Sequence, residues 1–138
     1  MNGFVANQAP VPRGLNILIA DDVGDTRKLL NWVLRQLDCG IVEEAHNGEE
    51  ALMVFETLDP AVVFLDIEMP VMNGIETLKR IKEIRPQAFV VIASGFSSMA
   101  NVKLALDAGA NGFVVKPFSI SKVGDILRKY AEERASEQ

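Results

Sequence analysis

Five side chains suited to metal binding or group transfer each stand at the end of a short apolar run: Asp21, Asp22, Asp66, Ser94 and Lys116. Apolar runs of this length are typical of strands that are buried on both faces of a parallel sheet. Open α/β sheets bind their ligands outside the carboxyl ends of the strands. The sequence therefore predicts that these side chains gather at one edge of a sheet.

The aspartates favour a divalent metal ion. Carboxylates that lie close together raise one another's pKa unless a cation joins them. A small set of oxygen ligands that is open to solvent suits Mg2+, which keeps several waters and accepts phosphate oxygens. The backbone carbonyl of Glu68, in the turn after Asp66, is a further candidate ligand.

A metal ion beside a carboxylate, an ammonium and a hydroxyl suits phosphoryl transfer. The transition state of this reaction is loose, so catalysis consists mostly of positioning and of charge neutralisation. Asp66 is the candidate nucleophile, which becomes an aspartyl phosphate. Lys116 supplies a compact positive charge, and Ser94 supplies a hydroxyl donor.

Predicted strands and helices alternate along the chain. The strands cover residues 15–20, 41–45, 61–66, 88–93 and 112–115. The helices begin near Asp25, after the caps Asn47 and Ser119, after Asn73-Gly74, and at Ser98. Three apolar residues, Leu29, Ile84 and Ile120, belong to helical stripes that we expect to face the sheet.

This alternation predicts an α/β domain with helices on both faces of a parallel sheet. Because crossovers are right-handed, few topologies remain. We predict a flavodoxin-like (βα)5 doubly wound fold whose five strands have the order 2-1-3-4-5, which sets the first and third strands side by side. We place the domain at residues 15–131, with a mobile tail at 1–14 and a C-terminal tail at 132–138.

Composition excludes several classes of protein. The chain has 138 residues and a net charge of −5, which argues against direct nucleic-acid binding. No apolar run approaches the roughly 20 residues of a membrane span, and the start does not resemble a secretion signal. The single cysteine, Cys39, excludes a disulfide within the chain. We expect a cytoplasmic protein that does not insert into membranes.

Four sequence marks occur in order on this strand pattern. They are Asp21-Asp22, the segment DIEMP at 66–70 with Asn73-Gly74, Ser94, and Lys116-Pro117-Phe118. With these marks, residues 15–130 resemble the receiver domain of two-component response regulators, the CheY-like proteins of chemotaxis and sporulation phosphorelays.

The resemblance assigns a role to each marked residue. It implies that Asp66 is the phosphoacceptor and that Asp21 and Asp22 hold Mg2+. Lys116 contacts the phosphoryl group or Asp66, and Ser94 bonds a phosphoryl oxygen after transfer.

The resemblance also implies a conformational switch. Phe113 stands at the position where an aromatic ring changes rotamer as Ser94 moves. The Lys116-Pro117 bond is expected to be cis, as in that family. Phe96, two residues after Ser94, is expected to lie beside the opening of the predicted site. There it is expected to limit water entry and to slow self-dephosphorylation.

The predicted function is a stand-alone signalling switch rather than an enzyme. A sensor histidine kinase or a histidine phosphotransfer protein donates the phosphoryl group to Asp66, and a downstream effector protein then binds. Candidate contacts for that effector are Val102, Lys103, Phe113 and Lys122. Arg27 is expected to be a surface charge of the first helix, near the acidic residues.

Three alternatives remain open on the sequence alone. The chain is a receiver fragment of a larger response regulator or hybrid kinase, a flavodoxin-type electron carrier, or a metal-dependent phosphatase with an aspartyl intermediate. Asp21-Asp22 argues against the flavodoxin, because these carboxylates repel a flavin phosphate. Glu68 argues against the phosphatase, which commonly carries a second aspartate at that position.

Overall fold

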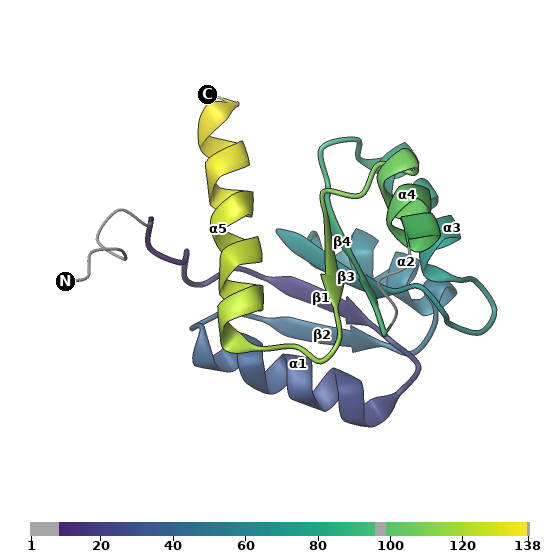
Figure 1. Ribbon diagram of the computed structural model, residues 1–138, viewed down its shortest axis with the longest axis horizontal. Helices are drawn as coiled ribbons and strands as arrows, with labels where there is room; N and C mark the ends of the chain where they lie inside the picture. The colour runs from purple at the N-terminus through teal and green to yellow at the C-terminus, as the bar shows by residue number, and fades with distance from the viewer. Residues whose placement is uncertain (1–8, 96–98, 138) are drawn as a thin grey trace.

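Five parallel strands form one sheet in the order β2-β1-β3-β4-β5, which confirms the predicted topology (Figure 1). The computed structural model describes residues 9–95 and 99–137. The strands are β1 (Ile17–Ala20), β2 (Val42–Ala45), β3 (Val62–Asp66), β4 (Phe89–Ser94) and β5 (Gly112–Val115). Every residue of β1, β3 and β4 is buried, whereas the half-polar β2 lies at an edge.

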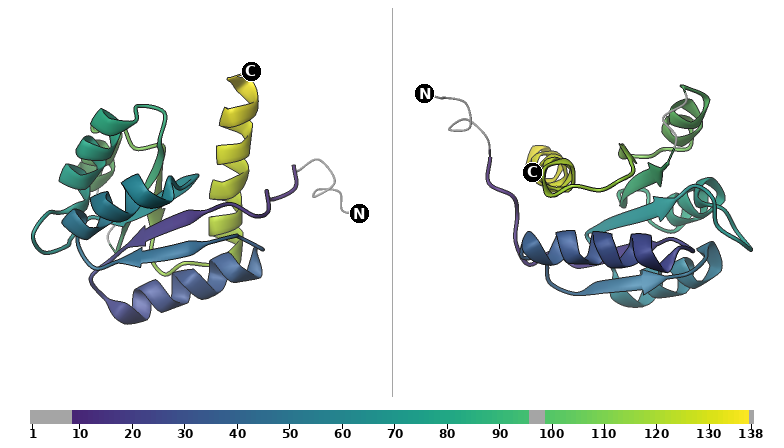
Figure 2. Two further views of the ribbon diagram at one scale, coloured as in Figure 1. Left: turned by 180° about the vertical axis from the view of Figure 1, so that it is seen from behind. Right: turned by 60° about the horizontal axis from the view of Figure 1, so that its bottom comes forward.

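Helices cover both faces of the sheet. They are α1 (Gly24–Gln36), α2 (Gly48–Leu58), α3 (Gly74–Ile84), α4 (Met99–Asp107) and α5 (Ile120–Ser136). α1 and α5 lie on one face, and α2, α3 and α4 lie on the other (Figure 2). Because side chains of a strand alternate between faces, the sheet supplies two separate hydrophobic cores, one under each helix layer.

Side-chain caps fix where three helices begin. Asn47 accepts from the Glu50 backbone N–H, and Ser119 accepts from that of Lys122, as the sequence predicts. Asn73 caps α3 in the same way, by accepting from the Glu76 backbone N–H. The cap of α3 bears directly on function, because this helix starts in the turn that follows Asp66.

Three inward predictions are wrong, since Leu29, Ile84 and Ile120 are exposed. Ile84 is the last residue of α3 and Ile120 is the first residue of α5, so both stand at helix ends. Leu29 lies on the flank of α1, whose buried residues include Leu30 and Val33. A stripe read from periodicity does not show where a helix passes the edge of the sheet.

Both predicted tails make contacts with the domain. Val11 packs against the core between α1 and α5, and the Ala9 carbonyl accepts from Arg128 Nε at 2.8 Å. At the other end, α5 continues to Ser136, and Arg134 donates to the Gln87 carbonyl at 2.8 Å. The boundaries at residues 15 and 131 stay predictions.

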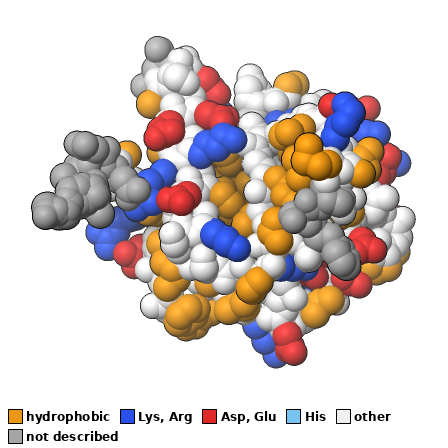
Figure 3. Space-filling view, viewed as in Figure 1, with side chains coloured by type: hydrophobic (Ala, Val, Ile, Leu, Met, Phe, Trp, Pro, Cys, Tyr) orange, Lys and Arg blue, Asp and Glu red, His pale blue; other side chains and the backbone are white. Residues whose placement is uncertain are grey.

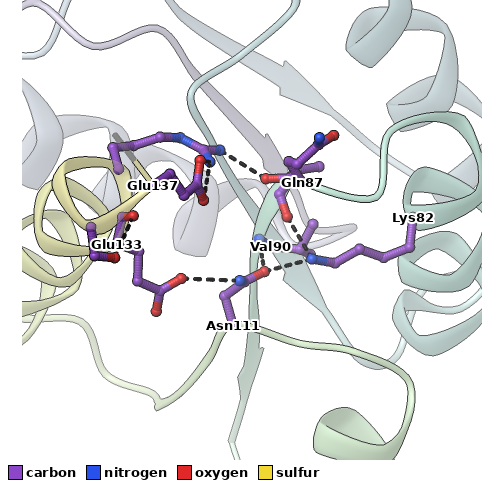
Figure 4. A network of polar contacts seen from close by, with 9 residues as sticks. Lys82, Gln87, Val90, Asn111, Glu133 and Glu137 are labelled. Carbon is purple, nitrogen blue, oxygen red and sulfur yellow. Dashed lines mark hydrogen bonds and ion pairs between the residues drawn. The ribbon is translucent and has the colours of Figure 1, made fainter.

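A polar network ties α3, β4, β5 and α5 together at the amino end of the strands (Figure 4). Asn111 Oδ1 accepts from Lys82 Nζ at 2.8 Å and from the Val90 backbone N–H at 2.9 Å. Asn111 Nδ2 reaches Glu133 at 3.4 Å, and Lys129 donates to the Asn111 carbonyl. Burial lowers the pKa of Lys82, whose ammonium also bonds the Ala88 carbonyl. Asn111 thus fixes the start of β5.

No helix among residues 9–95 and 99–137 combines the length and the apolar character that crossing a membrane requires.

Candidate functional site

Three carboxylates meet at the carboxyl ends of β1 and β3. Ala20 of β1 pairs with Leu65 of β3, so Asp21 and Asp66 follow at neighbouring positions of adjacent parallel strands. Asp22 completes the cluster, and one carboxylate oxygen from each of the three lies within 4.8 Å of the others. Asp21 and Asp66 are buried, whereas Asp22 is exposed.

Lys116 bridges two of these carboxylates. Its ammonium lies 2.8 Å from Asp21 Oδ2 and 3.0 Å from Asp66 Oδ1. The residue follows β5, and its backbone N–H donates to the Ser94 carbonyl at 2.8 Å. The Lys116-Pro117 bond is cis, as expected. Residues separated by 95 positions in the chain therefore share one ion-pair cluster.

The charges of the cluster act on one another. Burial raises the pKa of Asp66, and the negative charges of Asp21 and Asp22 raise it further against the lowering effect of Lys116. Burial alone would lower the pKa of Lys116, but its bonds to Asp21 and Asp66 outweigh this, and the net pKa is raised. Lys116 therefore stays charged at neutral pH, and the site holds an excess of negative charge.

Local backbone contacts hold the loops that carry the aspartates. The Val23 N–H donates to Asp21 Oδ1 at 2.8 Å, and the Asp21 N–H donates to the Ala45 carbonyl at 3.1 Å. After β3, the Gly74 N–H donates to the Ile67 carbonyl at 2.8 Å, which folds the turn back to start α3. These bonds fix the backbone from which Asp21 and Asp66 project.

Ser94 and Phe113 lie on the same face of the sheet. Ser94 is the buried last residue of β4, beside the Asp66–Ala93 pair, and it stands opposite Val115. Phe113 is opposite Ile92 and is partly buried against the core under α4. Because side chains alternate along a strand, Ser94, Ile92 and Phe113 share the face that α4 covers. Their roles in a switch remain predictions.

Glu68 lies at the mouth of the cluster. Together with Asp22 and Asn73 it lines an open pocket of about 450 Å³. Its backbone carbonyl as a ligand remains a prediction. Phe96, which we expected to slow water entry, lies outside the described residues.

Arg27 is not the surface charge that we expected. Only 13% of its side chain is exposed, and it pairs with Glu44 on β2 at 3.0 Å. Its Nη1 also donates to the Asp21 carbonyl at 2.7 Å. Sequence spacing gave no sign of this pair, because its members lie 17 positions apart on different elements.

The predicted effector surface carries more apolar area than the sequence indicated. Lys103 and Lys122 are exposed, and Val102 and Phe113 are half-buried. Met99 is 84% exposed, and Leu104 and Leu106 are also exposed on α4, where Figure 3 shows a hydrophobic patch. These three residues were missed because helical periodicity alone does not reveal which side of a short helix faces solvent.

The oxygen donors of the cluster fit Mg2+. All three side chains are carboxylates, and no histidine or cysteine belongs to this group among the described residues. Hard cations of this kind prefer oxygen ligands. Asp21, Asp22 and Asp66 are the residues that would hold the ion.

Comparison with known proteins gives a family for the chain. Residues 17–128 match the model of the response regulator receiver domain. The chemotaxis protein CheY of Thermotoga maritima is 38% identical over 119 residues, which cover 86% of this chain and 99% of that protein. CheY of Bacillus subtilis is 37% identical over 113 residues, covering 82% and 94%.

Solved structures agree with this result. CheY of Borrelia burgdorferi, in a complex with CheX, BeF3 and Mg2+, has a TM-score of 0.77 and 35% identity, covering 82% of this chain and 86% of that one. A CheY-like receiver domain protein of Methanospirillum hungatei has a TM-score of 0.81 and 26% identity, covering 90% and 98%. The acidic cluster, the strand order and these matches together lead to one conclusion: the chain belongs to the response regulator receiver domain family.

Proposed function

We propose that this receiver domain is a phosphorylation-dependent switch in which Asp66 accepts a phosphoryl group in the presence of Mg2+. The donor is a sensor histidine kinase or a histidine phosphotransfer protein, and the output is a change in the binding of an effector protein. We place this switch in the cytoplasm, as the sequence predicts. The observation that carries it is the Lys116 ammonium placed between Asp21 and Asp66, at 2.8 and 3.0 Å.

The transfer step uses groups already close together. An Asp66 carboxylate oxygen attacks the phosphorus, the P–N bond of the donor phosphohistidine breaks, and an acyl phosphate forms. Bound Mg2+ would neutralise charge on the phosphoryl oxygens. Lys116 stabilises the same charge from the side of β5, and Ser94 offers a hydroxyl from the end of β4.

The output follows from where Ser94 and Phe113 lie. Both face the core under α4, so a shift of Ser94 toward the phosphoryl group is expected to change the packing of Phe113. The effector surface then comprises α4, β5 and α5, with Val102, Lys103, Phe113 and Lys122 as candidate contacts. The exposed Met99 and Leu106 add apolar area to it. Such a switch needs a phosphoryl group that favours one of two states.

Intact-mass measurement after incubation with acetyl phosphate tests the acceptor. We expect the mass of one phosphoryl group to be added with Mg2+, and far less with EDTA. Asp66→Asn should abolish this gain. Asp125→Asn serves as the matched control, because it removes an exposed carboxylate on α5 that pairs with Arg128, three residues further along the same helix. Gain in Asp66→Asn equal to that of the control would refute the assignment.

The phosphatase alternative predicts a different result. A phosphatase would hydrolyse phosphomonoesters over many turnovers, whereas a switch should carry at most one phosphoryl group per chain and release it slowly. The flavodoxin alternative keeps only the shared strand order in its favour, since the family match is to receiver domains. An absorbance spectrum without flavin bands is expected.

A further inference from the structure

Arg27 connects α1 to two other parts of the molecule. Its Nη1 donates to the Asp21 carbonyl at 2.7 Å, and its Nε donates to Glu44 Oε1 at 3.0 Å on the edge strand β2. The side chain is 13% exposed, so water competes little for these bonds. The guanidinium is therefore fixed between the β1–α1 loop and β2.

Glu44 is itself anchored. Its second carboxylate oxygen accepts from Asn31 Nδ2 at 2.9 Å, one turn further along α1 than Arg27. Both oxygens of Glu44 are thus bound by donors from the same helix. This leaves Arg27 Nη1 aimed at the loop, where it meets a main-chain oxygen and not one of the clustered carboxylates.

The contact acts on the peptide unit that joins Asp21 to Asp22. A peptide is planar, so holding the Asp21 carbonyl also sets the direction in which the chain leaves toward Asp22. The Asp21 carboxylate is held separately, by the Val23 N–H and by Lys116. Asp22 is exposed, and its orientation depends on the backbone of this loop.

We infer that Arg27, anchored by Glu44, is a positioning residue that orients the Asp21–Asp22 peptide so that both carboxylates serve one cation. This role rests on the proposed Mg2+-dependent function. For the change in Mg2+ affinity on removing Arg27, this role predicts the opposite direction to charge repulsion alone. A nearby positive charge that did nothing but repel Mg2+ would, when removed, tighten Mg2+ binding. A positioning residue would, when removed, weaken it.

Calorimetric titration with MgCl2 separates the two cases. We expect Arg27→Met to bind Mg2+ about tenfold more weakly than the wild type, the usual scale for loss of a partner behind a ligand. Lys28→Met is the matched control: it also removes one positive charge from α1, at the next position, but the Lys28 side chain is exposed. The control should bind as the wild type does, or slightly more tightly. Arg27→Lys keeps the charge and should fall between.

A second measurement needs no metal. The Val23 amide donates to Asp21 Oδ1, so its hydrogen exchange reports the order of this loop. In EDTA we expect faster exchange at Val23 in Arg27→Met, with the amides of β3 unchanged and the fold retained by circular dichroism.

The outcomes are distinguishable. Equal or tighter Mg2+ binding by Arg27→Met, when the wild type binds Mg2+, would overturn the positioning role and leave the proposed function intact. If the wild type bound no Mg2+, the proposed function would fail, and exchange at Val23 would then decide the effect of Arg27 on the loop: faster exchange supports it and unchanged exchange rejects it.

Discussion

Gly74 lies directly against Asp66, because a Cβ built on Gly74 would stand 2.1 Å from the Asp66 carbonyl oxygen. No side chain fits at that distance. The first residue of α3 is thereby seated on the strand end that carries the proposed phosphoacceptor.

Gly74→Ala should move α3 away from β3 and disturb the site. The added methyl meets backbone, which cannot rotate aside, so we expect a loss of roughly 1 to 3 kcal/mol in the free energy of unfolding. Phosphorylation by acetyl phosphate should also slow. Urea denaturation and intact-mass time courses measure the two effects.

Gly124→Ala is the control for the Gly74 substitution. It also adds a methyl within a helix, but its nearest neighbour there, a methyl of Val11, lies at an ordinary 3.6 Å. This variant should be equal to or more stable than the wild type, by up to about 1 kcal/mol, because alanine is the better helix former. Equal losses in both variants would contradict the close contact at Gly74.

Asp66→Asn should stabilise the metal-free protein in a pH-dependent way. Burial raises the pKa of Asp66 in the folded state, so its contribution to stability is fully present below the unfolded pKa, about 4. That contribution is lost as pH rises through the folded pKa. Since asparagine does not titrate, the advantage of Asp66→Asn over the wild type should grow from about pH 4 toward neutral pH.

Urea denaturation in EDTA at several pH values measures this difference. Asp125→Asn, at an exposed position of α5, is the control for replacing a carboxylate by an amide. A difference between Asp66→Asn and wild type that stays constant with pH would mean that burial of Asp66 has no net effect on its ionisation.

Val71 occupies an unfavourable backbone conformation in the β3–α3 turn. Its φ is 69°, in the left-handed region, and its side chain is exposed, so packing gives nothing in return. Left-handed φ costs roughly 1 to 2 kcal/mol for most L residues, and asparagine tolerates it better. Val71→Asn should therefore raise the melting temperature, whereas Val71→Ala should not; equal melting temperatures would contradict the strain.

Asn111→Ala should destabilise the domain through the amino end of the sheet. It leaves the Val90 N–H and the Lys82 ammonium without the oxygen that each now bonds at 2.9 and 2.8 Å. Leaving the buried Val90 donor unpaired costs about 1 to 3 kcal/mol, whereas Lys82 keeps its bond to the Ala88 carbonyl. Gln87→Ala is the control, because only its backbone carbonyl takes part in the network, as acceptor from Arg134. Similar stability of the two variants would show that the network is not needed.

The sequence determined the order of elements, the strand topology and the residues of the acidic cluster. Apolar runs mark buried strands, and polar residues directly after them must stand at the carboxyl edge of a parallel sheet. Asp21, Asp66 and Lys116 could therefore be predicted as neighbours, as the ion pairs now confirm.

Only the tertiary structure decided what surrounds these residues. Arg27 has its partner on another element, and the exposure of Leu29, Ile84 and Ile120 depends on where each helix runs relative to the sheet. The contact between Gly74 and Asp66 depends on how closely the backbones of α3 and β3 approach each other. The presence of a glycine in the sequence does not reveal that distance. Periodicity and motifs describe one element at a time, whereas these features depend on the distance between elements that packing sets.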